Sequence, residues 1–176
     1  IVDALPAKVQ LQTGGGIRTR DDVKALLDAG VTAVVVGSQA VKAPDVVRQW
    51  FTEFGPERIV LALDVRVSDL GSAQVATAGW QETSGALIDD VVKTYLPCGL
   101  KHVLCTDIAR DGMMTGPSVD LYARLAKAFP QVVWQASGGI ASLADVRAAE
   151  NAGAAGVIVG RALLENRFTV KEALSC

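Results

Sequence analysis

The feature that most constrains the fold of this chain is a repeat of 28 residues. Residues 14–41 read GGGIRTRDDVKALLDAGVTAVVVGSQAV, and 123 residues later residues 137–164 read SGGIASLADVRAAENAGAAGVIVGRALL, with eleven identical positions. This offset is longer than the roughly 20–50 residues expected of solenoid repeats. It favours two copies of a half-domain, each with glycine turns at two strand ends. Paired turns of this kind suit a ligand that has a phosphate group at either end.

Composition argues against a general nucleic-acid or membrane binder. Half of the 176 residues are hydrophobic, a fifth are charged, and the formal net charge is −2. This length fits one domain, residues 1–176, with a substantial buried core. The weak net charge provides no general field for nucleic acid or an acidic membrane surface. No apolar run approaches the ~20 residues that span a bilayer.

The cysteines and the single histidine limit the metal and redox chemistry. Cys98, Cys105 and Cys176 are odd in number and lack the spacing of metal ligands. We therefore expect reduced thiols, a cytoplasmic protein and no metal site. His102 starts a predicted strand, opposite the candidate chemistry, so we expect it to be structural. We also expect Trp50 and Trp134, which lie inside apolar segments, to belong to the core.

Short apolar strands alternate with amphipathic helices along the chain. The predicted strands are residues 8–12, 32–36, 59–63, 102–106, 132–136 and 155–159. The predicted helices are residues 20–29, 45–54, 87–96, 119–129, 143–151 and 169–174, and residues 68–84 form an excursion after the third strand. The strands are apolar on consecutive residues, which is typical of parallel strands covered on both faces.

The repeat decides between an open doubly wound sheet and a barrel, the two common outcomes of repeated βα units. Four such units lie between Gly15 and Gly138, so each duplicated half has four units and the whole has eight. This predicts an α/β fold, a (β/α)8 TIM barrel, of which the sequence contains about six units, the third to the eighth. Because this N-terminally incomplete barrel would have two free edges, we expect self-association through them. We expect the full-length form to be monomeric.

The glycine turns are the candidate phosphate sites. In (β/α)8 enzymes the active site lies at the carboxyl ends of the strands, and phosphate is often held after strands seven and eight. One cradle of backbone N–H groups is expected from Ser137, Gly138, Gly139, Gly160 and Arg161. Its counterpart is expected from Gly15, Gly16, Gly37 and Ser38. The alternative is that these glycines only permit tight turns.

Acidic and polar side chains at other strand ends are the candidates for acid–base chemistry. Asp64 closes an otherwise apolar strand, where a carboxyl group can act as a general acid. The alternative for Asp64 is a helix cap or a partner of Arg66. Asp111 begins an Asp-Gly turn, which explains it structurally as well, and Thr106 and Gly112 belong to the same loop.

Two further residues are candidates for ligand contacts. Trp80 lies on the excursion, where its indole could cover a flat ring or simply pack. Arg18 lies beside the first glycine turn, where it could bind a phosphate or carboxamide, or pair only with Asp21 or Asp22. The duplication also places a second carboxylate, symmetry-related to Asp64, upstream of Ile1.

Taken together, the motifs resemble one family of sugar isomerases. They are TGGGIR (13–18), VVVGSQAV (34–41), LALDVR (61–66), GW (79–80), CTDIARDG (105–112), ASGGI (136–140) and GVIVGRALLE (156–165). In this order they closely resemble the phosphoribosylformimino-aminoimidazole carboxamide ribotide (ProFAR) isomerases of histidine biosynthesis. The resemblance covers the whole chain and is nearest to the single-function enterobacterial members.

The resemblance implies an Amadori rearrangement of an aminoaldose to an aminoketose, without a cofactor. It implies that Asp64 is the proton donor, that Thr106 and Asp111 contact the substrate, and that Trp80 stacks on its ring. The glycine turns correspond to two phosphate sites for a bis-phosphorylated ribonucleotide. The family's general base is an aspartate in a PALDL-like segment, which has no counterpart here. We therefore expect weak turnover from residues 1–176 alone, because loss of such a base lowers rates by about 10²–10⁴-fold.

Three alternatives remain open on the sequence. The first is the cyclase subunit of imidazole glycerol phosphate synthase, against which LDVR stands where that family has a lysine-bearing strand end. The second is a bifunctional isomerase that also acts on phosphoribosyl anthranilate, against which the GWQETSG segment argues weakly. The third is a non-catalytic, phosphate-binding barrel fragment.

Overall fold

A curled sheet with helices on its outer side forms the fold. The computed structural model describes residue 6 and residues 9–77 and 82–176. The strands are β1 (Gln12–Gly14), β2 (Ala33–Val36), β3 (Ile59–Val67), β4 (Ala73–Thr77), β5 (Glu82–Leu87), β6 (His102–Asp107), β7 (Val133–Ser137) and β8 (Gly156–Ile158). The parallel path through the sheet is β1-β2-β3-β6-β7-β8, and the β4–β5 hairpin pairs antiparallel with β3.

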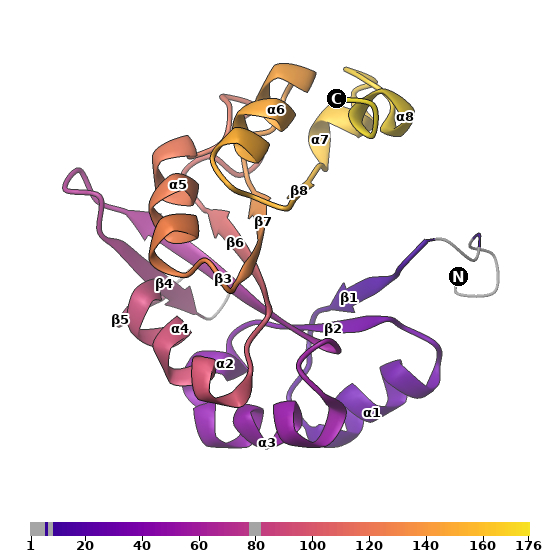
Figure 1. Ribbon diagram of the computed structural model, residues 1–176, viewed down its shortest axis with the longest axis vertical. Coiled ribbons are helices and arrows are strands. Elements are labelled where there is room, and N and C mark those ends of the chain that lie inside the picture. Colours follow the sequence, from indigo (N-terminus) through magenta and orange to yellow (C-terminus); the bar gives the residue numbers. More distant parts are fainter. Residues whose placement is uncertain (1–5, 7–8, 78–81) are drawn as a thin grey trace.

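The helices follow the strands and cover the convex face of the sheet (Figure 1). They are α1 (Arg20–Asp28), α2 (Gln39–Lys42), α3 (Pro44–Phe54), α4 (Ile88–Tyr95), the 3-10 helix η2 (Leu96–Cys98), α5 (Val119–Ala128), α6 (Leu143–Asn151), α7 (Arg161–Leu164) and α8 (Val170–Ala173). None of the helices within the described ranges is long and apolar enough to cross a membrane.

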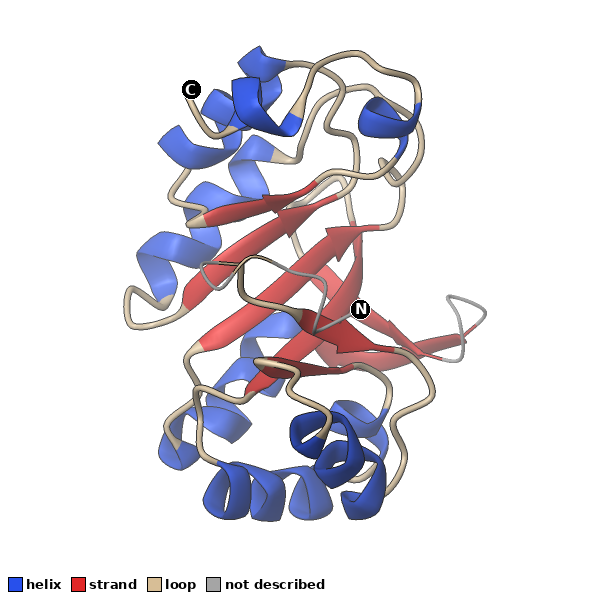
Figure 2. Ribbon diagram, turned by 90° about the vertical axis from the view of Figure 1, so that its right-hand side faces the viewer, coloured by secondary structure: helices blue, strands red, loops and turns tan. Residues whose placement is uncertain are grey.

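The two ends of the parallel path, β1 and β8, leave the curl open. Figure 2 looks onto this open side and shows the strands at the centre with the helices outside them. Parallel strands joined through helices and curled in this way form part of a (β/α)8 barrel, so the predicted fold class is confirmed.

Side chains that alternate along the strands lie on a buried convex face and on a more solvent-exposed concave face. Leu61, Leu63 and Trp134 point to the helices and are at most 1% exposed. On the concave side, Val133 and Ile158 remain 39% and 37% exposed. Trp50 is 2% exposed, so the expectation that both tryptophans belong to the core is confirmed. Consecutive apolar residues are thus explained by two faces that are both apolar but unequally covered.

Several predicted element boundaries were wrong. Residues 9–11 are not in a strand, and β1 begins at Gln12. The predicted end of the third strand at Asp64 is also wrong, because Val65, Arg66 and Val67 continue β3 by pairing with β4. The excursion is largely this β-hairpin, β4 and β5, rather than a loop. The short helices α2 and α7, of four residues each, were not predicted, since so few residues leave no periodic pattern.

The repeat in the sequence is also a repeat in the structure. Thr19 caps α1 and forms a capping box with Asp22, and Ser142 caps α6 and forms a capping box with Asp145. Both carboxylates accept from the two backbone N–H groups that precede the helix, at 2.8–3.0 Å in each copy. The two glycine turns therefore leave the sheet and enter a helix by the same hydrogen bonds.

Candidate functional site

The carboxyl ends of β6, β7 and β8 surround a cavity of about 300 Å³. Its lining is Asp111, Gly112, Met114, Ser137, Gly138, Gly139, Ile140, Ile158, Gly160 and Arg161. Every residue that the sequence assigned to the C-terminal phosphate cradle is in this lining, together with two residues from the Asp-Gly turn. The cavity lies at the end of the barrel where the strands finish, which is where (β/α)8 enzymes bind their ligands.

Gly138 and Gly139 line this cavity and are tightly packed. Their φ angles are +96° and +86°, a region that side chains rarely adopt. A Cβ atom on Gly138 would lie 2.8 Å from the carbonyl oxygen of Asp107, and one on Gly139 would lie 2.1 Å from that of Gly116. The glycines therefore permit the turn and also admit the loop that follows β6. The sequence alone predicted the turn and an anion cradle, but not this packing against the loop.

The loop between β6 and α5 brings Asp111 and Gly112 to the cavity. The N–H of Asp111 donates to the carbonyl of Asp107 at 3.1 Å. The Arg161 guanidinium donates to the carbonyl of Gly112 through Nη1 at 2.8 Å and to Glu165 Oε1 through Nε at 2.6 Å. The Arg161 side chain is thus held by the loop and by its own helix at the lining of the cavity.

Asp64, Thr106 and Ser137 form a row across β3, β6 and β7. Strand register pairs Asp64 with Thr106 and Thr106 with Ser137, so the three side chains share the concave face. Asp64 is half-buried, whereas Thr106 and Ser137 are 5% and 7% exposed. A carboxyl group therefore lies two strands from Ser137 in the cavity lining, on the same face as two hydroxyl groups that can donate or accept hydrogen bonds.

Comparison with known proteins agrees with this arrangement. The histidine biosynthesis protein family matches residues 1–169. The chain belongs to this family. A relative from Citrobacter koseri is 60% identical and one from Cronobacter sakazakii is 58% identical, each over 168 residues that cover 96% of this chain and 69% of the relative.

Both relatives are named 1-(5-phosphoribosyl)-5-((5-phosphoribosylamino)methylideneamino) imidazole-4-carboxamide isomerase. A third relative, from Photorhabdus laumondii, is 56% identical over the same coverage and carries the same name with the suffix 1. These relatives support the isomerase reading of the motifs over the cyclase alternative.

The second predicted cradle of this chain, formed by Gly15, Gly16, Gly37 and Ser38, is open. Gly15 and Gly16 have φ angles of +104° and +69°, and apart from the glycine itself and its chain neighbours no described atom lies within 4 Å of a Cβ built on either. Gly37 follows β2, and the exposed Ser38 begins α2 without a side-chain capping bond. All four residues lie at the carboxyl ends of β1 and β2, at the same end of the strands as the cavity.

Arg18 lies beside this open cradle with an exposed side chain. Its backbone N–H donates to Asp22 Oδ2 at 3.0 Å, and its carbonyl accepts from Gln39 Nε2 at 3.4 Å. The backbone N–H groups of Arg18 and Thr19 are the main cause of a lowered pKa of Asp22. Asp21 pairs with Arg20 at 3.0 Å. The contact of Arg18 with Asp22, which the sequence left open as an alternative to ligand binding, is a hydrogen bond from its backbone, and among the described residues its exposed side chain makes no hydrogen bond to Asp21 or Asp22.

The family's resemblance also assigned a ring-stacking role to Trp80, which lies outside the described residues. His102 lies at the amino end of β6, and its Nε2 is 3.0 Å from Glu57 Oε2. Lys101 also donates to Glu57, and these two bonds hold the pKa of Glu57 below its usual range, with the Lys101 bond the larger cause. This placement, at the end of the strands away from Asp111, agrees with the expectation that His102 is structural.

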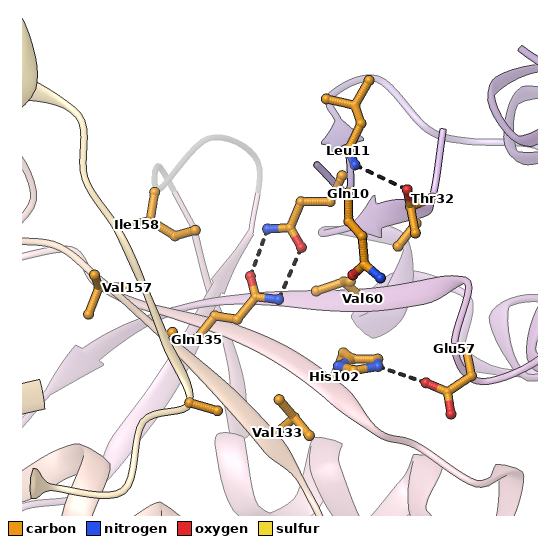
Figure 3. Close-up of a pocket in the computed structure, with 14 residues that line it drawn as sticks. Gln10, Leu11, Thr32, Glu57, Val60, His102, Val133, Gln135, Val157 and Ile158 are labelled. Carbon is orange, nitrogen blue, oxygen red and sulfur yellow. Dashed lines mark hydrogen bonds and ion pairs between the residues drawn. The ribbon is translucent and has the colours of Figure 1, made fainter. Parts of the chain in front are cut away.

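Sequence reasoning missed a glutamine pair inside the curl (Figure 3). Gln12 and Gln135 exchange two amide hydrogen bonds, of 2.7 and 3.0 Å, across a cavity of about 460 Å³. Their separation is 123 residues, the offset of the repeat. The signal was available, because both glutamines lie two residues before the compared segments and obey the same offset.

Sequence reasoning also missed Tyr122, a buried residue of α5 that contacts the backbone of β6 and β7. The buried phenol of Tyr122 lies 3.0 Å from the carbonyl of Cys105 and 2.9 Å from that of Ser137, and it accepts from the N–H of Ser137 at 3.1 Å. Burial raises the pKa of Tyr122 above its usual range. This neutral phenol therefore ties α5 to the ends of β6 and β7. A single Tyr at helical spacing carries no sequence signal for such a role.

Proposed function

We propose that this chain acts on a ribonucleotide with two phosphoribosyl arms and catalyses the isomerisation for which its relatives are named. The observation that carries the proposal is the placement of two glycine turns, 123 residues apart, at the same end of the strands as Asp64. A ligand with one phosphate at each end matches two anion sites built from the same backbone geometry.

The proposed chemistry is proton transfer without a cofactor. Asp64 donates a proton to the ribose ring oxygen, the bond between that oxygen and the anomeric carbon breaks, and a Schiff base forms with the amine nitrogen. In residues 1–176, where the family's aspartate base has no counterpart, solvent takes the proton from the adjacent sugar carbon, and this step is slow. The resulting enolamine takes up a proton at the former anomeric carbon and loses the proton of its enol hydroxyl group to give the aminoketone. In this scheme Thr106 and Asp111 hold the opened sugar, and Trp80 stacks on the carboxamide-bearing ring.

The two cradles have separate tasks in this proposal. The turn of Gly138 and Gly139 together with Gly160 and Arg161 binds one phosphate, through the cavity described above. The turn of Gly15 and Gly16 with Gly37 and Ser38 binds the other, assisted by the exposed Arg18 side chain. Binding both ends of the substrate fixes the ribose between them, which lowers the entropic cost of reaching the reactive geometry.

The test of the proposed function is Asp64→Asn in this 176-residue chain. Substrate isomerisation is followed by absorbance, and substrate binding by calorimetry. Loss of turnover by about 10²-fold or more with affinity within about tenfold is expected of a proton donor. Asp69→Asn, in the exposed turn after β3, is the matched control and keeps both properties. Unchanged turnover in Asp64→Asn would refute the role of Asp64, and absence of any isomerisation by the unaltered chain would refute the function for residues 1–176.

We also propose that the chain self-associates through its free edges. In the described part of the sheet, β1 pairs only with β2, and β8 pairs only with β7. Unpaired backbone groups on edge strands favour pairing with another chain. Sedimentation velocity across a range of concentrations is expected to show a growing dimer fraction that Ile158→Lys, on edge strand β8, reduces. A single monomer species at all concentrations would overturn this proposal.

A further inference from the structure

Asp107 is a buried carboxylate to which the proposed reaction gives no task. It is the last residue of β6 and is 4% exposed, although it is next to Thr106 in the candidate site. Carboxylates are rarely buried so completely unless they are paired and hydrogen-bonded. The contacts of Asp107 therefore indicate what it stabilises.

The hydrogen bonds and the ion pair described for the Asp107 carboxylate lie within one loop, residues 107–118. Oδ1 accepts from the N–H of Ala109 at 3.0 Å, and Oδ2 accepts from the hydroxyl of Ser118. The Nε of Arg110 lies 3.8 Å from Oδ2. Asp107 ends β6 and Ser118 is the N-cap of α5, so this one carboxylate joins the two ends of the loop.

Arg110 carries this constraint to the far limb of the loop. Its Nη1 donates to the carbonyls of Thr115 and Gly116, at 3.2 and 3.0 Å. The N–H of Gly116 in turn donates to the carbonyl of Gly139 at 2.9 Å. A chain of contacts thus runs from the buried Asp107 through Arg110 to the glycine turn of the cavity, and Asp111 lies in the middle of the loop that it closes.

We propose that Asp107 is a positioning residue that fixes the carboxyl group of Asp111 at the rim of the cavity. Its negative charge orients Arg110, and its two oxygens fasten both ends of the loop. The loop contains turns but no helix or strand of its own, so these side-chain bonds replace the regular backbone bonds that would otherwise define its shape. The role of Asp111 in turnover rests on the function proposed above, whereas the positioning itself does not.

The first test needs no substrate. In Asp107→Asn, an amide N–H group replaces the carboxylate oxygen that accepts from the Ser118 hydroxyl, and the negative charge beside Arg110 is lost. The loop should therefore open more often. Hydrogen exchange of the amides of Asp111, Met113 and Gly116 is expected to accelerate by about tenfold or more. The matched control is Asp89→Asn, which removes an ion pair to Arg124 at 2.8 Å on α5 and leaves the loop contacts intact. Ser118→Ala, which removes one bond and no charge, is the milder variant should Asp107→Asn fail to fold.

The second test separates positioning from general stability. Turnover of Asp107→Asn is expected to fall roughly 10- to 100-fold with a KM within about threefold, because small displacements of a reactive group have effects of this size. In an Asp111→Asn background the same change should add little, since it acts through Asp111. Accelerated loop exchange with an additive double variant would overturn the proposal, and so would unchanged exchange. If Asp111→Asn keeps full turnover, the proposed role of Asp111 fails, and the exchange data still decide whether Asp107 orders the loop.

Discussion

The two copies of the glycine turn differ in what packs against them. Gly15-Gly16 and Gly138-Gly139 share sequence, positive φ angles and the capping box of the helix that follows. Around the first pair a Cβ atom would meet open space, whereas around the second it would meet the backbone of residues 107–116. The repeat therefore keeps the backbone geometry of the two proposed anion sites, while tertiary contacts make one copy a packed wall and leave the other open.

The largest expected effect is a difference between Gly139→Ala and Gly16→Ala. Both changes place Ala at a positive φ angle, which costs about 1–2 kcal/mol. Only Gly139→Ala also forces a methyl group to within 2.1 Å of the Gly116 carbonyl oxygen, and such overpacking costs a further ~1–3 kcal/mol. Urea unfolding is expected to show the greater loss of unfolding free energy in Gly139→Ala. Equal losses in the two variants would show that the packed wall is not a real difference between the copies.

How much of this contrast the sequence predicts depends on the range of the interactions involved. Helix α6 was predicted at its observed bounds, Leu143–Asn151, because its cap and its apolar spacing are local. The predicted end of β3 was wrong because β3 continues by antiparallel pairing with β4, and this partner is identified only in the folded sheet. The contact between Gly116 and Gly139 joins residues 23 positions apart and has no local signature.

The candidate site was predictable to the extent that it reflects the repeat. The residues of the C-terminal cradle meet in one cavity because a parallel sheet brings all of its strand ends to one edge. Sequence reasoning placed Asp107 in the TDIARDG loop but missed its role, and it missed Tyr122 and the glutamine pair. These roles depend on which side chains are buried together. A Gln at a strand position reads as a polar interruption until its partner across the curl is known.

The glutamine pair provides a second, smaller test, because its hydrogen bonds join the two strands that lead into the repeated segments. Gln12 and Gln135 exchange two amide bonds, and a side-chain hydrogen bond contributes a net ~0.5–1.5 kcal/mol. In a double-mutant cycle of Gln12→Ala and Gln135→Ala, a coupling free energy of about 1 kcal/mol is expected from thermal or urea unfolding. Additive single variants would indicate that the two copies do not stabilise each other through this pair.

The smallest expected effect concerns pH and the cap of the open copy. The pKa of Asp22 is lowered, mainly by the backbone N–H groups of Arg18 and Thr19, so its charged form is favoured in the folded state. A lowered folded-state pKa stabilises the protein above the unfolded pKa of ~3.9 and ceases to do so as the pH falls through the lower, folded value. At pH 6, roughly two units above the unfolded pKa, Asp22→Asn is therefore expected to have a lower unfolding free energy than the unaltered chain. This difference should shrink in acid.

Asp21→Asn is the matched control, because it removes the same charge from the same helical turn without touching the cap. At pH 6, about two units above the usual pKa of an aspartate, Asp21→Asn should lower the unfolding free energy by less than Asp22→Asn does. Asp21 makes an exposed ion pair with Arg20, and exposed pairs contribute little to stability. If the two variants respond alike at every pH, the cap does not hold the open turn in shape. The shared geometry of the two copies would then have to come from the glycines and the strand register alone.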